Sequence, residues 1–391
     1  MFDVLIIGGG SVGTSLAAAI RSACLNVGLV ESQPAKPAPS SLAWDSRIFA
    51  ISSGSAAFLQ QCDAWQHLDL ARVQAVEQMC VWGDEGAALD FSAYQMGVPE
   101  LAFILENRAL QEAIWQQAIG QASTAQSNLT LFQPARCEHL RWTEEAAHLT
   151  LQDGRILQAK LIVGADGADS WVRQQAGIVV NPTSYQQHGV VANFMAEKSH
   201  RGTAFQWFQP DGILALLPLP QNNVSMVWSV SLQKSAHLLQ LSEQALCAEI
   251  ASASQHKLGA LQLLNKPSAF PLRRLYVPQT VKPRLALIGD AAHNIHPLSG
   301  QGINLGFGDA QQLAQVLLQR GAEQDCGNIH LLRRYERARK EDVTAMIIAT
   351  DMLKKLFNND HPLLRMARNS GLAFTNRMMP LKKMLARHAM N

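Results

Sequence analysis

The stretch VLIIGGGSVG, which occupies residues 4–13, decides the fold. An apolar strand runs into glycines in the pattern Gly8-x-Gly10-x-x-Gly13, which is typical of a βαβ unit that binds a dinucleotide. The first glycine permits a tight turn, the second lets the backbone approach a pyrophosphate, and the third lets helix and strand pack closely. The stretch therefore predicts a nucleotide-binding α/β domain at the start of the chain.

The residues that follow extend this prediction. We expect a helix over about residues 14–22, whose N-terminal N–H groups face the phosphates, and a second strand over residues 27–30. Glu31 then falls at the strand end, where a carboxylate accepts hydrogen bonds from ribose hydroxyls. An acid there suits an adenosine without a 2′-phosphate. The fingerprint alone does not separate FAD from NAD, and a glycine-rich turn in another α/β protein has the same letters.

Two distant motifs favour FAD. Residues 161–173 read LIVGADGADSWVR, an apolar strand that ends at the glycine-flanked Asp166 and passes into a helix. The alternative for Asp166 is a turn that caps this helix. Residues 285–293 read LALIGDAAH, a second buried strand that ends at Gly289 and Asp290. Ligands of open α/β sheets lie beyond the carboxyl ends of the strands, so Asp290 is placed to hold a ribityl hydroxyl.

The loop that follows is the predicted catalytic scaffold. Its residues Pro297, Gly300, Gln301 and Gly302 lead into an apolar helix over about residues 303–318. The first N–H groups of that helix would face the flavin pyrimidine ring, where they stabilise the negative charge of a reduced flavin.

His293 and His296 offer an alternative reading of the same segment as a metal site. Their three-residue spacing suits ligands on a helix, but Pro297 and the glycines indicate a loop, and no carboxylate cluster joins them.

The bulk properties exclude several classes of function. The chain has 391 residues, 48% hydrophobic and 16% charged, with a net charge of only +2, so a nucleic-acid partner is not expected. No apolar run reaches the roughly 18 residues of a membrane-spanning helix, and no secretory signal precedes the first strand, which predicts a soluble cytoplasmic protein. Its six cysteines lack metal-site spacing and are expected to be buried thiols: Cys24, Cys62, Cys80, Cys137, Cys247 and Cys326.

Together, the three motifs resemble the fingerprint, "DG" and "GD" motifs of class A flavin-dependent aromatic monooxygenases, which have the para-hydroxybenzoate hydroxylase fold. The segment DSRIFAI at residues 45–51 is similar to the family's D-x-R-x-x-A-I/L, and this resemblance places Arg47 near the flavin. Asn107 stands where broader family members commonly carry an arginine, so no flavin role is assigned to Asn107 or Arg108. Residues 269–272 (AFPL) and the tail motif RNSGL at 368–372 resemble the ubiquinone-biosynthesis hydroxylases of the UbiH/UbiF/UbiI group.

This resemblance implies a two-stage reaction. NADH or NADPH reduces FAD, and the reduced flavin captures O2 as a C4a-hydroperoxide that hydroxylates an electron-rich ring. The implied substrate is a polyprenylated phenol or quinol intermediate of ubiquinone biosynthesis. A soluble aromatic substrate is the first alternative. A non-catalytic flavin subunit of a membrane-associated assembly is the second.

The expected architecture is α/β, α+β overall: a Rossmann-like FAD-binding domain with an inserted β-sheet substrate domain and a helical C-terminus. The FAD-binding domain takes residues 1–180, including substrate-layer strands at 70–105, and residues 278–350; the β-sheet domain takes 181–277. Aromatic residues of the predicted sheet either line an apolar cavity or form simple sheet core: Phe205, Trp207, Phe208 and Trp228.

The last segment, residues 351–391, predicts basic amphipathic helices broken near Pro362 and Pro380. From Met352 onward it has eight lysines and arginines against one acid, Asp360. Such a surface suits the inner face of a cell membrane or a partner in a biosynthetic complex. The alternative is a helical end that packs on its own domain. The oligomeric state is left open.

Overall fold

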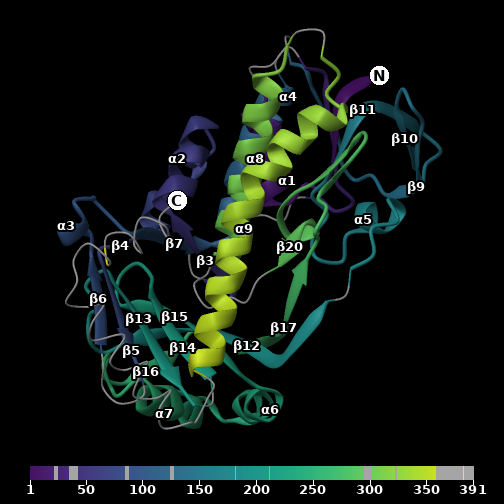
Figure 1. The fold of residues 1–391 in the computed structure, drawn as a ribbon. Coiled ribbons are helices and arrows are strands. Elements are labelled where there is room, and N and C mark those ends of the chain that lie inside the picture. Colours follow the sequence, from purple (N-terminus) through teal and green to yellow (C-terminus); the bar gives the residue numbers. More distant parts are fainter. Residues whose placement is uncertain are drawn as a thin grey trace.

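The computed structural model describes residues 1–21, 25–34, 43–83, 88–123, 127–180, 182–210, 212–294, 301–321, 324–357 and 382. It confirms the expected fold class, a mixed α/β architecture in which a parallel sheet and a separate mostly antiparallel sheet each carry their own helices (Figure 1).

The nucleotide-binding part is built on a parallel sheet. Its strands follow the order β19-β11-β1-β2-β8, with β18 antiparallel at one edge. The bounds are β1 Phe2–Ile7, β2 Val27–Val30, β8 Leu129–Phe132, β11 Ile156–Gly164, β18 Val281–Lys282 and β19 Leu285–Leu287. The centre of β1 is fully buried and carries only apolar side chains, as expected of a strand covered on both faces.

Helices cover one face of this sheet, and a hairpin covers the other. The helices are α1 Ser11–Ala19, α4 Asn107–Ala122, α8 Gly302–Leu318 and α9 Ile329–Phe357. Helix α1 packs between α4 and α8, and α9 runs along α8 (Figure 1). The hairpin of β9 Cys137–Trp142 and β10 Ala147–Leu151 extends from β11 and, with α5 Trp171–Gln175, closes the opposite core. Burying one large apolar side chain such as Phe307 stabilises the fold by about 2 kcal/mol.

The inserted sheet has the order β20-β17-β12-β15-β14-β13-β5-β6. Its bounds are β5 Gln78–Trp82, β6 Ala88–Ser92, β12 Thr183–Ala196, β13 Thr203–Gln209, β14 Gly212–Pro218, β15 Asn223–Ser231, β16 Leu261–Leu263, β17 Ser268–Tyr276 and β20 His293–Asn294, with β16 beside β12. Helices α6 Leu232–Gln240 and α7 Glu243–Ala253 lie against one face (Figure 1). The other face is turned towards the nucleotide-binding part.

A small sheet joins the two parts. It consists of β3 Ile48–Ser52, β7 Ala102–Glu106 and β4 Gln74–Val76. The remaining elements are α2 Ser53–Gln61, α3 Ala93–Met96 and the short 3-10 turns Trp65–His67, Leu70–Arg72 and Gly289–Ala291. The expected strands at 70–105 are therefore divided between this small sheet and the edge of the inserted sheet.

Two predicted elements are confirmed, and two predicted bounds differ from the structure. The expected second strand over residues 27–30 coincides with β2, and the predicted helix over 303–318 is α8. The first helix begins at Ser11 instead of residue 14, because Gly10 has an extended backbone and takes the N-cap position. The expected domain boundary after residue 350 falls inside α9, a continuous helix.

The described part of the tail is small. Apart from the end of α9, only Lys382 is described; it is buried, with Nζ 5.9 Å from the centroid of the Phe91 ring. The predicted breaks at Pro362 and Pro380 lie outside the described residues, as does Cys24. The other five cysteines are free thiols. No described helix has both the length and the apolarity that a membrane crossing requires.

Candidate functional site

The three predicted motifs meet at one edge of the parallel sheet. Ile7 of β1 lies beside Gly164 of β11, and Gly164 lies beside Leu287 of β19. The residues that follow these strand ends are therefore brought together, although Ile7 and Leu287 are 280 positions apart in sequence. The carboxyl ends of parallel strands are where ligands of such sheets bind.

Glycines permit this close approach at two positions. A Cβ on Gly13 would lie 2.1 Å from the carbonyl oxygen of Gly8, so helix α1 can approach the turn only if no side chain is present there. Gly8 has a φ of +109°, and its own Cβ would lie 2.4 Å from the carbonyl oxygen of Ala165. At Gly10, by contrast, a Cβ would meet nothing within 4 Å. That position faces open space where the pyrophosphate is expected.

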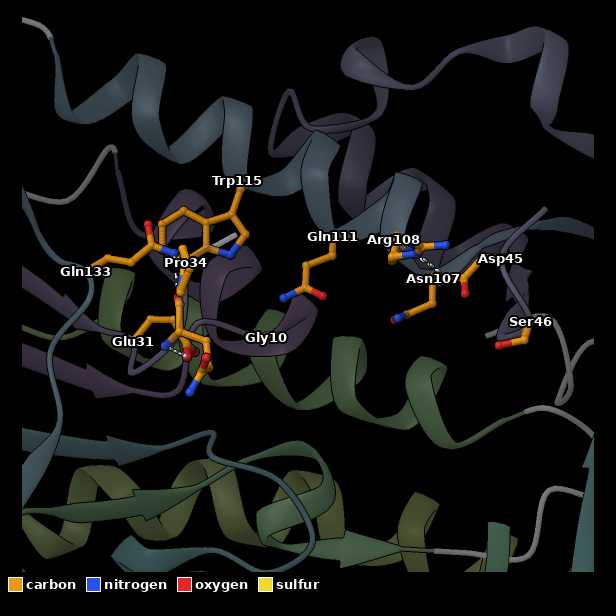
Figure 2. A pocket seen from close by; sticks show the side chains of 11 residues that line it. Gly10, Glu31, Pro34, Asp45, Ser46, Asn107, Arg108, Gln111, Trp115 and Gln133 are labelled. Carbon is orange, nitrogen blue, oxygen red and sulfur yellow. Dashed lines mark hydrogen bonds and ion pairs between the residues drawn. The ribbon is translucent and has the colours of Figure 1, made fainter. Parts of the chain in front are cut away.

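Glu31 lies at one end of a cavity of about 570 Å³ (Figure 2). Its carboxylate accepts the Gly9 N–H at 2.7 Å and the Gln33 N–H at 2.8 Å, so the strand end is tied to the glycine turn. Each carboxylate oxygen can accept more than one hydrogen bond, and capacity for a hydroxyl group is left.

Helix α4 supplies the wall of this cavity, which sequence reasoning missed. Asn107, Gln111 and Trp115 line it at four-residue spacing, one face of the helix (Figure 2). The Trp115 ring nitrogen donates to the Gly9 carbonyl oxygen at 2.7 Å and fixes the glycine turn from behind. The i, i+4, i+8 spacing of these polar and aromatic side chains is the sequence signal that could have identified this wall. Arg108 also lines the cavity.

A second cavity of about 980 Å³ continues from the first. Both cavities are lined by Gly10, Ser46, Asn107 and Gln111, so they form one elongated space. The second reaches Asp290 and the start of α8 and then the inserted sheet.

Arg47 lies in the second cavity, on a segment held by buried ionic groups. The Asp45 carboxylate accepts the Arg47 N–H at 3.3 Å and the Arg108 N–H at 3.1 Å. Glu106, fully buried, accepts the Asp45 N–H at 2.6 Å and pairs with Arg72 at 2.7 Å. The Arg47 carbonyl oxygen also accepts the Asn107 N–H at 2.9 Å, so the backbone is fixed on both sides of the Arg47 side chain.

Asp166 does not line either cavity. It accepts the Ser170 hydroxyl at 2.5 Å and the Val172 N–H at 3.0 Å, so its carboxylate ties down the start of α5. Burial raises its pKa, and these hydrogen bonds oppose the increase. Its neighbours Ala165, Gly167 and Ala168 face the second cavity instead.

Asp290 lines the second cavity. Burial raises its pKa, while His293 and Arg47 lower it. Behind it, the fully buried Asp309 of α8 accepts the Gly289 N–H at 2.9 Å and His293 Nε2 at 2.6 Å. The His293 ring contacts Asp309, and His296, the second histidine of the alternative metal site, lies outside the described residues.

Arg339 of α9 completes this network. Its Nε donates to Asp309 at 2.8 Å, and its guanidinium also reaches the Leu305 carbonyl oxygen at 3.1 Å. Burial alone would raise the pKa of Asp309, but the contacts with His293 and Arg339 hold it below its ordinary value. The network fixes the Gly289 turn relative to two helices.

The expected catalytic loop falls partly within the described residues. Pro297 and Gly300 lie outside the described residues, whereas Gln301 and Gly302 line the second cavity at the start of α8. Gln301 is the N-cap residue, and Asn304 holds the first turn against β3 by accepting the Ser52 N–H at 3.0 Å. The cavity is therefore lined by the N-terminal end of a long helix.

Of the two readings of the sheet aromatics, cavity lining or sheet core, the structure supports sheet core. Phe205, Trp207 and Trp228 pack in the core between the sheet and its helices, and Phe208 packs in a small cluster of its own. Alternation along β13 turns Ala204 and Gln206 to the cavity instead.

These features fit FAD. The space is elongated, with a carboxylate at the adenosine end, a glycine without a steric neighbour in the middle, and Asp290 with a helix N-terminus at the far end. A dinucleotide needs these groups in this order along its length.

Comparisons with known proteins agree with this assignment. The family model for an FAD binding domain matches residues 125–350. The 3-demethoxyubiquinol 3-hydroxylase of Escherichia coli (strain K12) is 35% identical, over 99% of this chain and 98% of that protein. Ubiquinone hydroxylase UbiL of Rhodospirillum rubrum is 34% identical, over 99% and 89%. The solved structure of PqsL from Pseudomonas aeruginosa, a probable FAD-dependent monooxygenase, shares the fold with a TM-score of 0.78 at 20% identity, over 95% and 99%.

The close approach at Gly13 gives a first prediction. Gly13→Ala should abolish FAD retention, because the new Cβ cannot fit 2.1 Å from the Gly8 carbonyl oxygen. The ratio of flavin to protein absorbance after purification measures this. Gly120→Ala on α4, where a Cβ meets nothing within 4 Å, is the matched control and should bind FAD normally. Normal flavin content in Gly13→Ala would contradict the prediction.

The Asp309 network gives a second prediction, which concerns stability. Asp309→Asn should lower the free energy of unfolding by about 3 kcal/mol, because it removes the buried counter-charge of Arg339 and leaves only the exposed Asp342. Asp342→Asn, which changes the exposed partner of Arg339, should cost less than about 1 kcal/mol.

The contribution of Asp309 to stability should also depend on pH. Since the folded pKa of Asp309 is lowered, its contribution is present above the unfolded value of about 4 and is lost as pH falls through the folded pKa. Denaturant unfolding at pH 7 and below pH 4 should therefore show the wild type and Asp309→Asn converging in acid. An equal difference at both pH values would count against this role.

Proposed function

This chain belongs to the FAD-dependent aromatic monooxygenases that include the ubiquinone hydroxylases, and from this premise we propose that it hydroxylates the ring of a polyprenylated phenol or quinol. The overall reaction consumes NAD(P)H, a proton and O2 and yields NAD(P)⁺, water and one new ring hydroxyl. The observation that carries the proposal is the continuity of the adenosine cavity with a largely apolar cavity under the inserted sheet.

Roles for the nucleotide-end residues follow from their positions. Gly8 and Gly13 shape the turn, Gly10 admits the pyrophosphate, and Glu31 accepts hydrogen bonds from the ribose. Asp166 acts indirectly, by holding the segment whose neighbours face the cavity.

The flavin ring end is formed by Arg47, Gly289, Asp290 and the start of α8. Asp290 would hold a ribityl hydroxyl, and the first amides of α8 after Gln301 and Gly302 would offset negative charge on the ring. Pro297 and Gly300 complete the loop in this proposal. Bound FAD supplies the hydride acceptance and the O2 activation that no side chain can provide.

The substrate end is enclosed mainly by apolar side chains. Val76, Met79, Phe91, Leu101 and Ile213 are among its lining residues. Such walls exclude water from the reacting ring and accept an isoprenoid chain without unpaired polar groups.

The decisive experiment is reduction of the FAD-loaded protein by NADH or NADPH under anaerobic conditions, with and without 3-demethoxyubiquinol, the compound for which the Escherichia coli relative is named. We expect the prenylated ring to accelerate flavin reduction and, after O2 is admitted, to gain one oxygen by mass analysis. Release of peroxide alone with this and other prenylated phenols would contradict the proposal and favour a non-catalytic flavin subunit.

Membrane docking through the basic tail is a second part of the proposal. A polyprenylated substrate resides in a bilayer, and residues 351–391 carry a strong excess of positive charge. Lys382 is turned to the protein, so the other basic residues would have to make the contact. Co-sedimentation with vesicles that contain anionic lipid, but not with neutral vesicles, is expected; no binding to either would refute docking.

A further inference from the structure

The cavity face of the inserted sheet differs from its helix face. On β13 and β15, the rings of Phe205, Trp207 and Trp228 pack under α6 and α7. Alternation leaves a second set of side chains to line the cavity: Ala204, Gln206, Ala215, Leu217, Val227 and Ser229. Most of this set is small or apolar. Gln206 and Ser229 are the exceptions.

Both exceptions are buried without a partner. Gln206 is 7% exposed and Ser229 4% exposed. On the same sheet, the Asn193 amide nitrogen donates to the Asp45 carbonyl oxygen at 2.8 Å, whereas the Asn193 side-chain oxygen and the Ser225 hydroxyl are also unpaired. Within the described part of the chain, neither the Gln206 amide nor the Ser229 hydroxyl has a hydrogen-bond partner. Because buried polar groups are normally satisfied, an unpaired amide and hydroxyl that face a cavity indicate that a ligand supplies the partner.

The strand register places the two groups on opposite sides of a flat apolar area. Gln206 on β13 pairs with Ala215 on β14, and Ala215 pairs with Val227 on β15. Ser229, two residues further along β15, pairs with Ile213 on β14. With strands about 4.8 Å apart, the two backbone positions are separated by roughly 10 Å across the strands. A substituted aromatic ring fits over such an area with its edges towards the two polar groups.

The chemistry of the pair restricts the ligand. A glutamine amide both donates and accepts hydrogen bonds, and a serine hydroxyl does the same. Neither carries charge, and the cavity-lining residues described on β13, β14 and β15 include no charged side chain. These groups suit neutral hydroxyl or methoxy oxygens, whereas the charged residues that line the cavity, Arg47, Arg273 and Asp290, lie on other elements.

We propose that Gln206, together with Ser229, recognises the oxygen substituents of the aromatic ring and is the specificity-determining residue of this enzyme. The proposal rests on the function proposed above and adds the group that distinguishes one ring-substitution state from another. A site built to hydrogen-bond a substrate oxygen discriminates strongly against an analogue that lacks it, because its own polar groups are then left unpaired.

The test compares Gln206→Leu, Ser229→Ala and a control, Gln262→Leu, which changes an exposed glutamine on β16 of the same sheet. Steady-state turnover of 3-demethoxyubiquinol is measured with NAD(P)H, together with the ratio of hydroxylated product to NAD(P)H consumed. We expect Gln206→Leu to raise KM by about tenfold or more and to lower the product ratio, with a smaller effect for Ser229→Ala. Gln262→Leu should match the wild type.

A substrate comparison makes the test specific. The wild type should prefer a prenylated ring with its oxygen substituents over an analogue that lacks one of them, and Gln206→Leu should lose most of that preference. FAD content and flavin reduction without substrate should be unchanged, which separates recognition from a folding defect. If Gln206→Leu does not fold, Gln206→Met, which keeps the side-chain length, takes its place.

The outcomes are distinguishable from failure of the proposed function. If the wild type hydroxylates the prenylated ring but Gln206→Leu keeps the same KM, product ratio and preference, the inference is overturned while the function stands. If the wild type hydroxylates no prenylated ring, the function fails and the inference falls with it.

Discussion

Adjacency of the carboxyl ends of β1, β11 and β19 is the constraint on which the rest of the site depends. These strands are far apart in sequence, yet their parallel pairing places Ile7, Gly164 and Leu287 side by side. Each is followed by a turn that contains glycine, and the turns can share so small a space because a Cβ on Gly8 or Gly13 would collide with backbone. Parallel pairing thus converts three separate motifs into one wall of a cavity.

Buried charges hold this wall from behind. Asp309 accepts hydrogen bonds from the Gly289 turn, from His293 and from Arg339, so β20, α8 and α9 are connected through one carboxylate. Glu106 serves the Asp45 segment in a similar way. Isolated buried charges are costly, and such groups are retained only when their partners are all in place. The two clusters make the positions of Asp290 and Arg47 sensitive to the packing of distant helices.

The motifs could be predicted from sequence because each is local: a strand, a turn with glycines and an acid at a fixed distance. The inserted sheet's strands were also recognisable from alternation and from the Pro, Gly and Asn breaks between them. The sequence could not show which face of that sheet lines the cavity. Alternation gives two faces, and only the packing of α6 and α7 decides which of them is covered. Phe205, Trp207 and Trp228 lie on the covered face.

Dependence on tertiary packing also explains why the sequence did not indicate the cavity-lining residues Gln111, Trp115 and Gln206. Trp115 and Gln111 belong to a helix whose amphipathic pattern is weak, and their importance depends on the loop that α4 happens to face. Gln206 carries no motif at all. The nucleotide end is therefore specified by short sequence patterns under backbone constraint, whereas the substrate end is specified by single side chains on an otherwise apolar face. A change of one such side chain is therefore expected to alter ring recognition without altering the strand ends that form the cofactor site.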